Sequence, residues 1–195
     1  MPQNFRHLGQ LDPFMVLRAL AEIETNADLW GRHTLRQTYP ESAHHDTETI
    51  YLRWAPEWTP ESIFESTDAV DYPDEIKRLP TVTNLLHDAV LAILNAYPKQ
   101  SGITTARMII TRLKPGGRID EHSDQGLYAQ TFKRFHVPLL SREGNLFACE
   151  WESVYMPPGG VWWFNHRRPH SVRNDSAEPR IHLILDAKLI DAESA

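Results

Sequence analysis

Two segments in the first hundred residues repeat their apolar positions at the spacing of an α-helix. The first begins at Asp12-Pro13, where Asp suits the N-cap and Pro the first helical position, so we expect a helix over about 12–25. The second covers Thr81–Tyr97 and ends before Pro98, because a residue that precedes proline disfavours the helical conformation. The apolar positions that define these helices are Phe14, Leu17, Leu20 and Ala21, then Leu85, Leu86, Ala89, Val90, Ile93, Leu94 and Tyr97.

After about residue 100 the apolar pattern changes to short runs rich in β-branched and aromatic residues, which are typical of strands. Turns such as Lys114–Gly117 and Pro157–Gly160 separate several of them. Many short strands at this spacing predict an all-β barrel or jelly roll. Within one run, alternation places Trp162 and Trp163 on opposite faces. The expected strands are Thr49–Trp54, Thr104–Leu113, Phe132–Leu139, Asn145–Trp151, Val154–Met156, Val161–Asn165 and Arg180–Ala187.

The chain has 195 residues, which suits one domain with a full core. We expect a single domain over 1–195, with a helical N-terminal part of about 1–100 packed on a β core of about 100–190. Pro56–Pro80 contains four prolines and many acidic residues, so we expect an irregular surface segment there. Loops of this length are often functional, and Glu57–Arg78 is a candidate lid. Arg53 and Trp54, which lead into it, are candidate substrate contacts.

The composition narrows the class of protein. Hydrophobic residues make up 41% and charged residues 24%, as in ordinary globular domains, and the net charge of −6 argues against nucleic-acid binding. The single cysteine, Cys149, excludes an internal disulfide and favours a reducing cytoplasm. The sequence shows neither an apolar signal segment nor an apolar run as long as a membrane span, so we expect no membrane partner.

Candidate metal ligands follow two of the expected strands. His122 and Asp124 come after a strand and a Pro-Gly-Gly turn, and residues two apart in an extended chain point to one side. His170 follows the strand at Val161–Asn165 and can return to the same end of the barrel. Two imidazoles and one carboxylate form the set that binds Fe(II) with open positions for oxidant and substrate, and the same ligands suit Mn(II) or Zn(II).

Other polar residues have plainer interpretations. His44 and Asp46 repeat the His-x-Asp spacing but lack a later partner comparable to His170, so we expect a polar turn before the strand at 49–54. His166-Arg167-Arg168 is expected to be a solvated turn.

Four pieces of the chain resemble the aspartyl/asparaginyl β-hydroxylase-like branch of the 2-oxoglutarate- and Fe(II)-dependent dioxygenases. Together they lie within roughly residues 104–188, and their order and spacing carry the resemblance. It implies a mainly β fold with flanking helices, a double-stranded β-helix (jelly roll, cupin-like). The pieces are Thr111–Asp124, Arg134–Leu139, Trp163–Asn174 and Arg180–Asp186.

The resemblance also implies roles for individual residues. His122 and His170 would be iron ligands, and Arg180 would pair with one carboxylate of 2-oxoglutarate. Animal members that hydroxylate peptide side chains have a glycine in place of the carboxylate ligand, whereas this chain has Asp124, which favours a full triad. Further co-substrate contacts would be Arg134, His136 and Thr111.

The chemistry of these residues agrees with that implication, because a planar guanidinium binds a carboxylate in a bidentate way. We therefore expect an Fe(II) enzyme, with 2-oxoglutarate as co-substrate, that hydroxylates an amino-acid side chain, free or in a peptide. Two alternatives stay open. One is a cupin-like Zn or Mn protein without 2-oxoglutarate chemistry, and the other is an interaction module whose histidines are structural.

Overall fold

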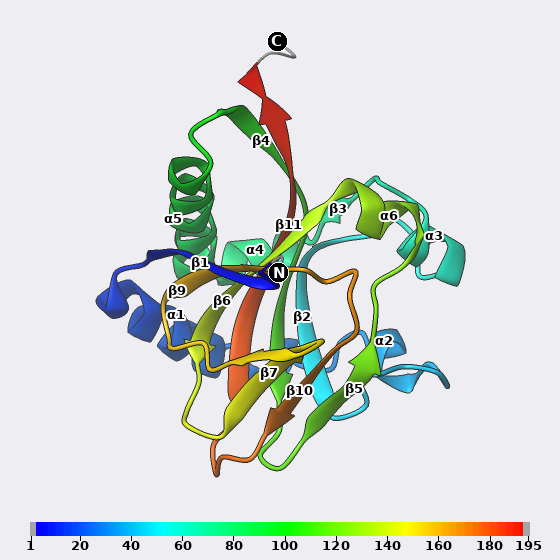
Figure 1. The fold of residues 1–195 in the computed structure, drawn as a ribbon. Helices are drawn as coiled ribbons and strands as arrows, with labels where there is room; N and C mark the ends of the chain where they lie inside the picture. The colour runs from blue at the N-terminus through cyan, green and yellow to red at the C-terminus, as the bar shows by residue number, and fades with distance from the viewer. Residues whose placement is uncertain (1–2, 193–195) are drawn as a thin grey trace.

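Two antiparallel sheets face each other in the computed structural model, which describes residues 3–192 (Figure 1). The major sheet has the strand order β1-β9-β6-β11-β4-β2-β3, with bounds Phe5–Gln10, Gly160–Phe164, Lys133–Leu140, Arg180–Asp191, Gln100–Leu113, Thr47–Trp54 and Val70–Asp71. The minor sheet has the order β5-β10-β7-β8, with bounds Arg118–His122, His170–Asn174, Asn145–Cys149 and Glu152–Val154.

Helices cover the outer face of the major sheet. The two long ones, α1 (Pro13–Thr25) and α5 (Pro80–Ala96), pack on each other and on β6 and β4 (Figure 1). The Asp12 carboxylate accepts the Phe14 backbone N–H at 2.8 Å and so caps α1 as expected. The short helices are η1 (Ala27–Leu29), α2 (Leu35–Thr38), α3 (Pro60–Phe64), α4 (Pro73–Arg78) and α6 (Gly126–Thr131).

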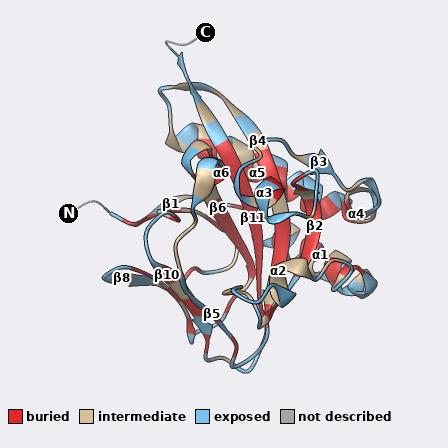
Figure 2. Cartoon of the chain, turned by 90° about the vertical axis from the view of Figure 1, so that its right-hand side faces the viewer, coloured by how far each residue is buried: buried red, intermediate tan, exposed pale blue. Residues whose placement is uncertain are grey.

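Side-chain alternation gives the major sheet one apolar and one polar face. On β11, Ile181, Leu183 and Leu185 belong to the large core beneath the helices, while Arg180 and His182 point the other way. Figure 2 shows long buried stretches along β2, β4 and β11. The second face meets the minor sheet through a separate apolar cluster that contains Phe5, Leu113, Ile119, Phe147, Phe164 and Val172.

The structure confirms the mainly β fold with flanking helices and differs in detail. Three strands that precede residue 100, β1, β2 and β3, join the major sheet, so both halves of the sequence share it. The prediction of an irregular segment over 56–80 is wrong in part, because the segment contains α3 and α4. Pro60 and Pro73 occupy first helical positions, where a proline costs no hydrogen bond.

Strand alternation on β9 follows the prediction. Trp163 packs against the large core under the helices and Trp162 against the cluster between the sheets, so the two rings face opposite sides. Residues 1–2 and 193–195 of the expected 1–195 domain lie outside the described residues. Within residues 3–192, no helix has the length and apolar character needed to cross a membrane.

Candidate metal centre

The minor sheet brings the three candidate ligands together. His122 ends β5, His170 begins β10, and the two residues are register partners in adjacent antiparallel strands. Asp124 follows two residues after His122. One ligand atom from each side chain lies within 4.8 Å of the others, so a single ion can contact all three.

Backbone carbonyls fix the orientation of both imidazoles. His122 Nδ1 lies 2.8 Å from the Asp120 carbonyl oxygen, and His170 Nδ1 lies 2.8 Å from the Arg168 carbonyl oxygen. Because a carbonyl only accepts, each Nδ1 carries the proton and each Nε2 keeps a lone pair for a metal. Burial lowers the pKa of His122 and lowers that of His170 to about 4, so both rings are neutral at neutral pH.

The carboxylate of Asp124 is held by two cationic or donor groups. Its Oδ2 accepts from Arg134 Nη1 and lies 3.0 Å from His166 Nδ1, while its Oδ1 lies 3.9 Å from His122 Nε2. Burial by itself would raise the pKa of Asp124, but Arg134 and His166 outweigh burial and hold that pKa well below its usual value. The ligand carboxylate is therefore ionised and fixed in direction.

Arg134 joins Asp124 to a second buried carboxylate. Its Nε and Nη2 donate to the two oxygens of Asp186 at 2.8 and 2.9 Å. The Tyr128 hydroxyl donates to Asp186 Oδ2 at 3.1 Å. Three of the guanidinium nitrogens thus contact protein carboxylates, which places Arg134 behind the triad. Its expected contact with 2-oxoglutarate stays a prediction.

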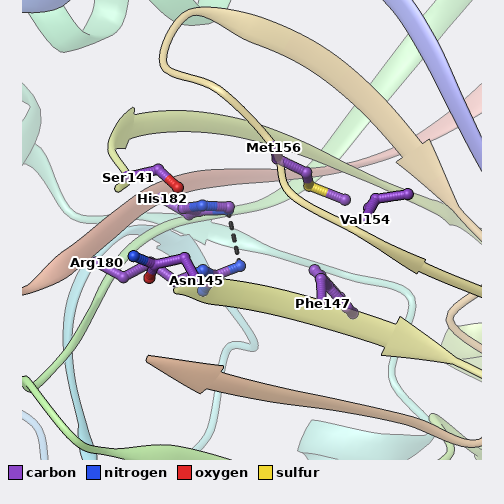
Figure 3. Close-up of a pocket in the computed structure, with 7 residues that line it drawn as sticks. All are labelled: Ser141, Asn145, Phe147, Val154, Met156, Arg180 and His182. Carbon is purple, nitrogen blue, oxygen red and sulfur yellow. Dashed lines mark hydrogen bonds between the residues drawn. The ribbon is translucent and has the colours of Figure 1, made fainter. Parts of the chain in front are cut away.

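Arg180 lies in a narrow pocket without any carboxylate partner among residues 3–192 (Figure 3). Its Nη2 contacts His182 Nδ1 at 3.0 Å, and burial lowers its pKa to about 9, which leaves it charged at neutral pH. An isolated buried cation is costly, so the pocket fits an anion. The pocket is lined by Ser141, Asn145, Phe147, Val154, Met156, Arg180 and His182.

Unpaired polar atoms around Arg180 strengthen this fit. Ser141 Oγ, Asn145 Oδ1 and His182 Nε2 are buried and have no hydrogen-bond partner in the described part of the chain. Native structures pair most such groups, so a bound polar molecule is the simplest partner for them. Ser141 Oγ and His182 Nε2 can donate, so the surroundings of Arg180 suit a small carboxylate in charge and in hydrogen bonding.

Aromatic rings connect this pocket to the triad. The Phe147 ring lies 6.1 Å from the His170 ring, and the Arg180 guanidinium carbon lies 5.6 Å from the Phe147 centroid. His136 contacts Phe147 at 5.4 Å between centroids, and its Nδ1 lies 3.2 Å from His182 Nδ1. Its Nε2 is unpaired within residues 3–192. The structure thus places His136 between the triad and Arg180.

The other predicted site residues lie on β4 and β2 of the major sheet. Thr111 is buried on β4 with His182 and Thr49 as register partners, on the face that carries Arg180. A bulge between Tyr51 and Arg53 shifts the alternation of β2. Trp54 is buried against Tyr51, whereas Arg53 pairs with Asp71 at 3.5 Å. Their role as substrate contacts stays a prediction.

The structure also brings in residues that the sequence analysis assigned elsewhere. The prediction of a solvated turn at His166 is wrong, because His166 is buried and contacts Asp124 and the Phe132 carbonyl oxygen. His44 packs on His122 with ring centroids 5.0 Å apart, and Arg36 contacts His44. These contacts join loops far apart in sequence, and no local pattern signals them.

Comparison with known proteins places this site in context. The chain matches the family model described as aspartyl/asparaginyl beta-hydroxylase over residues 21–189. A curated relative, L-proline cis-4-hydroxylase from Rhizobium meliloti (strain 1021), is 32% identical over 77 residues, which is 40% of this chain and 28% of the relative. The match therefore spans less than a third of the relative's length.

Solved structures match the fold over most of the chain. The viral collagen prolyl hydroxylase of Paramecium Bursaria Chlorella virus-1 has a TM-score of 0.56 at 11% identity and covers 97% of both chains. A 2OG-Fe(II) oxygenase family oxidoreductase from Burkholderia pseudomallei has a TM-score of 0.54 at 16% identity over 89% of both chains. A Pseudomonas putida prolyl-4-hydroxylase has a TM-score of 0.51 at 12% identity and covers 96% of this chain and 92% of its own. These matches confirm the jelly-roll fold.

Proposed function

Because the chain belongs to the aspartyl/asparaginyl beta-hydroxylase family, we propose that it is a non-haem Fe(II), 2-oxoglutarate-dependent dioxygenase that hydroxylates an amino-acid side chain. One observation carries the proposal: the three-ligand group His122, Asp124 and His170 lies on the same side of the major sheet as Arg180, a buried cation without a carboxylate partner among the described residues. A metal site with open positions beside an anion pocket is what a chelating dicarboxylate needs.

The residues divide the work of binding. His122, Asp124 and His170 would hold Fe(II) through two nitrogens and one oxygen. Arg180 would bind the far carboxylate of 2-oxoglutarate, with the Ser141 hydroxyl and His182 Nε2–H as neutral donors. When bound, iron and 2-oxoglutarate supply the oxidising chemistry, with O₂ consumed and succinate and carbon dioxide released.

Several residues would act on the site without contacting the substrate. Arg134 and His166 keep the Asp124 carboxylate ionised and oriented, and Asp186 fixes Arg134 in turn. Hydrogen bonds to a ligand side chain tune both the affinity and the geometry of a metal site. Phe147 and Phe164 exclude water from the space around His136 and His170.

The substrate class is supported by the relatives. The curated relative is named an L-proline cis-4-hydroxylase, and two of the similar structures are prolyl hydroxylases. We therefore propose a small-molecule or peptide substrate that presents an amino-acid side chain to the metal. A cytoplasmic location belongs to the same proposal, in keeping with the buried free thiol of Cys149.

A screen for succinate production tests the proposal. Purified protein would be incubated with Fe(II), 2-oxoglutarate and ascorbate against amino acids and short peptides. We expect substrate-dependent succinate and a pale charge-transfer band when 2-oxoglutarate is added to the anaerobic Fe(II) protein. Absence of the band together with tight Zn(II) or Mn(II) binding would instead support a cupin-like metal protein without 2-oxoglutarate chemistry.

A further inference from the structure

Arg36 is a second arginine near the triad that lacks a carboxylate partner in the described chain. It lies on α2, which runs beside the end of β5 where His122 sits (Figure 1). Its Nη2 donates to His44 Nε2 at 3.0 Å, and the His44 ring packs on the His122 ring. The Nη1 atom is shielded from solvent and has no hydrogen-bond partner within residues 3–192.

Two more polar groups around Arg36 are buried and unpaired. His44 Nε2 accepts from Arg36, so in the neutral ring Nδ1 carries the proton, and that N–H has no acceptor in the described residues. The Tyr51 hydroxyl, on the polar face of β2, is likewise without a partner there. Tyr51 lies two residues after Thr49 on β2, and Thr49 accepts from Gln37, the neighbour of Arg36 in the chain. Burial raises the pKa of Tyr51, and the charge of Arg36 partly offsets this.

Hydrogen bonds on both sides of Arg36 hold α2 in position. Gln37 Nε2 donates to Thr49 Oγ1 at 2.9 Å and so ties α2 to β2. The Ser42 hydroxyl donates to the Arg36 carbonyl oxygen and closes the following turn. A buried donor left unpaired is destabilising, because it loses its hydrogen bond to water and gains none in return. Three such donors in one place, on a fixed support, are best explained by an acceptor that binds there.

The charges around the triad indicate the chemical class of the acceptor that Arg36 binds, if the proposed function holds. With Fe(II) and 2-oxoglutarate bound, the positive charges of the metal, Arg134 and Arg180 are balanced by Asp124, Asp186 and the dianion. Two cations then remain without a carboxylate, Arg107 and Arg36. Arg107 donates to three backbone carbonyl oxygens. Arg36 is half-buried and keeps an unpaired Nη1, and burial lowers its pKa only to about 10, so it stays charged.

We propose that Arg36, together with His44 and Tyr51, binds a carboxylate of the substrate. A guanidinium favours a carboxylate over a neutral amide because both of its parallel N–H donors then meet a charged acceptor. An internal residue of a peptide has no α-carboxylate, whereas a free amino acid does. The subsite therefore selects free amino acids over residues within a peptide chain.

Paired probes separate charge recognition from general structural effects. L-Proline and the other standard L-amino acids, each with its α-carboxamide, would be titrated into the anaerobic protein with Fe(II) and 2-oxoglutarate. Binding would be followed by the change in the charge-transfer band and by thermal stabilisation, and turnover by succinate release. The variants are Arg36→Met, Arg36→Lys and Tyr51→Phe. Arg18→Met, an exposed arginine on α1, is the matched control.

We expect the wild-type protein to bind at least one free acid more than about tenfold tighter than its carboxamide, as loss of a charge-assisted contact implies. Arg36→Met should remove most of this preference by weakening the acid alone, with Arg36→Lys intermediate and Arg18→Met unchanged. Tyr51→Phe should reduce the preference modestly. Affinity for 2-oxoglutarate should stay near wild type in all four variants, since Arg180 is intact.

Two results would overturn the subsite. One is an Arg36→Met or Tyr51→Phe protein that keeps the full wild-type preference for acid over carboxamide and has the circular dichroism spectrum of the folded wild type. The other is a wild-type protein that binds no free acid but hydroxylates an internal peptide residue. Both leave the charge-transfer band of 2-oxoglutarate in place. Loss of that band in the wild-type protein would instead contradict the proposed oxygenase, and this inference with it.

Discussion

At the scale of single residues, hydrogen-bond partners decide which buried side chains are free to bind a ligand. Arg134 and Arg180 lie on the same face of the major sheet, yet Arg134 contacts two carboxylates and Arg180 contacts none among residues 3–192. The same distinction holds for the histidines. Backbone carbonyls occupy Nδ1 of His122 and His170 and leave Nε2 for a metal.

Removal of either imidazole should test the ligand set. We expect His122→Ala and His170→Ala to lose more than about a hundredfold in Fe(II) affinity, because each removes one of three protein ligands and even outer contacts are worth 10–100-fold. His44→Ala should retain iron, since His44 Nε2 contacts Arg36. The iron content of each of the three variants is measured after anaerobic dialysis. Wild-type iron binding by His170→Ala would show that the ligand set is wrong.

Arg180 should control affinity for the co-substrate and leave the metal unaffected. Loss of a bidentate contact in a dry pocket costs about 2–5 kcal/mol, which is roughly thirtyfold or more in affinity. We expect the apparent Michaelis constant for 2-oxoglutarate to rise by that factor in Arg180→Met. The constant of Arg180→Lys should lie between those of the wild type and Arg180→Met, because lysine keeps the charge and loses the two parallel N–H donors. An unchanged constant with normal iron content would place 2-oxoglutarate elsewhere.

At the scale of elements, a buried arginine fastens the candidate lid to the sheet. Arg107 on β4 donates to the carbonyl oxygens of Ile63, Ser62 and Ser66 at 2.6, 3.1 and 3.4 Å. Its guanidinium also stacks between the rings of Trp54 and Tyr128. These contacts explain how a segment with two very short helices keeps a defined position beside the site.

Arg107→Met should therefore release this segment. Each hydrogen bond from a charged donor contributes about 1.5–3 kcal/mol, so we expect amide hydrogen exchange over residues 60–69 to rise at least tenfold while β4 and β11 stay protected. Hydrogen-exchange mass spectrometry measures this, with Arg18→Met as control. If the segment is a lid, exchange over 57–78 should also slow in the wild-type protein when Fe(II), 2-oxoglutarate and substrate are bound. Unchanged exchange would mark the segment as surface only.

At the scale of the whole molecule, the site occupies the space between two sheets, and this space buries neutral histidines. Burial, with a smaller contribution from Arg180, lowers the pKa of His136 and His182 well below 6.5. Below pH 6.5 these two histidines are protonated in the unfolded chain and stay neutral in the folded protein. Unfolding is therefore favoured progressively as the pH falls from about 6.5.

The metal-free protein should accordingly lose stability on acidification. Each histidine contributes up to about 1.4 kcal/mol per pH unit below its unfolded pKa. We expect the free energy of unfolding from urea titrations to fall between about pH 7.5 and 5.5, and His182→Gln to show a slope smaller by about one proton. An equal slope in wild type and variant would mean that His182 is protonated in the folded protein.

The sequence by itself predicted those parts of the fold and site that depend on local pattern. The capped helix at 12–25, the amphipathic helix after Pro80 and most strands follow from periodicity, because burial of one face is written into the spacing of apolar residues. The order of His122, Asp124, His170 and Arg180 along the chain carried the family resemblance, which the family match confirms. Strand alternation also placed Trp162 and Trp163 on opposite faces.

Only the tertiary structure decided which side chains meet across the sheets. His166 looked like part of a solvated turn, yet the fold buries it against Asp124. Arg134 and Arg180 look alike in sequence, and the presence of Asp186 beside one and not the other separates their environments. Arg36 contacts His44, whose ring packs on His122, because Gln37 ties α2 to β2. Such contacts depend on long-range packing, whose energy is spread over many residues, and so no short sequence pattern encodes them.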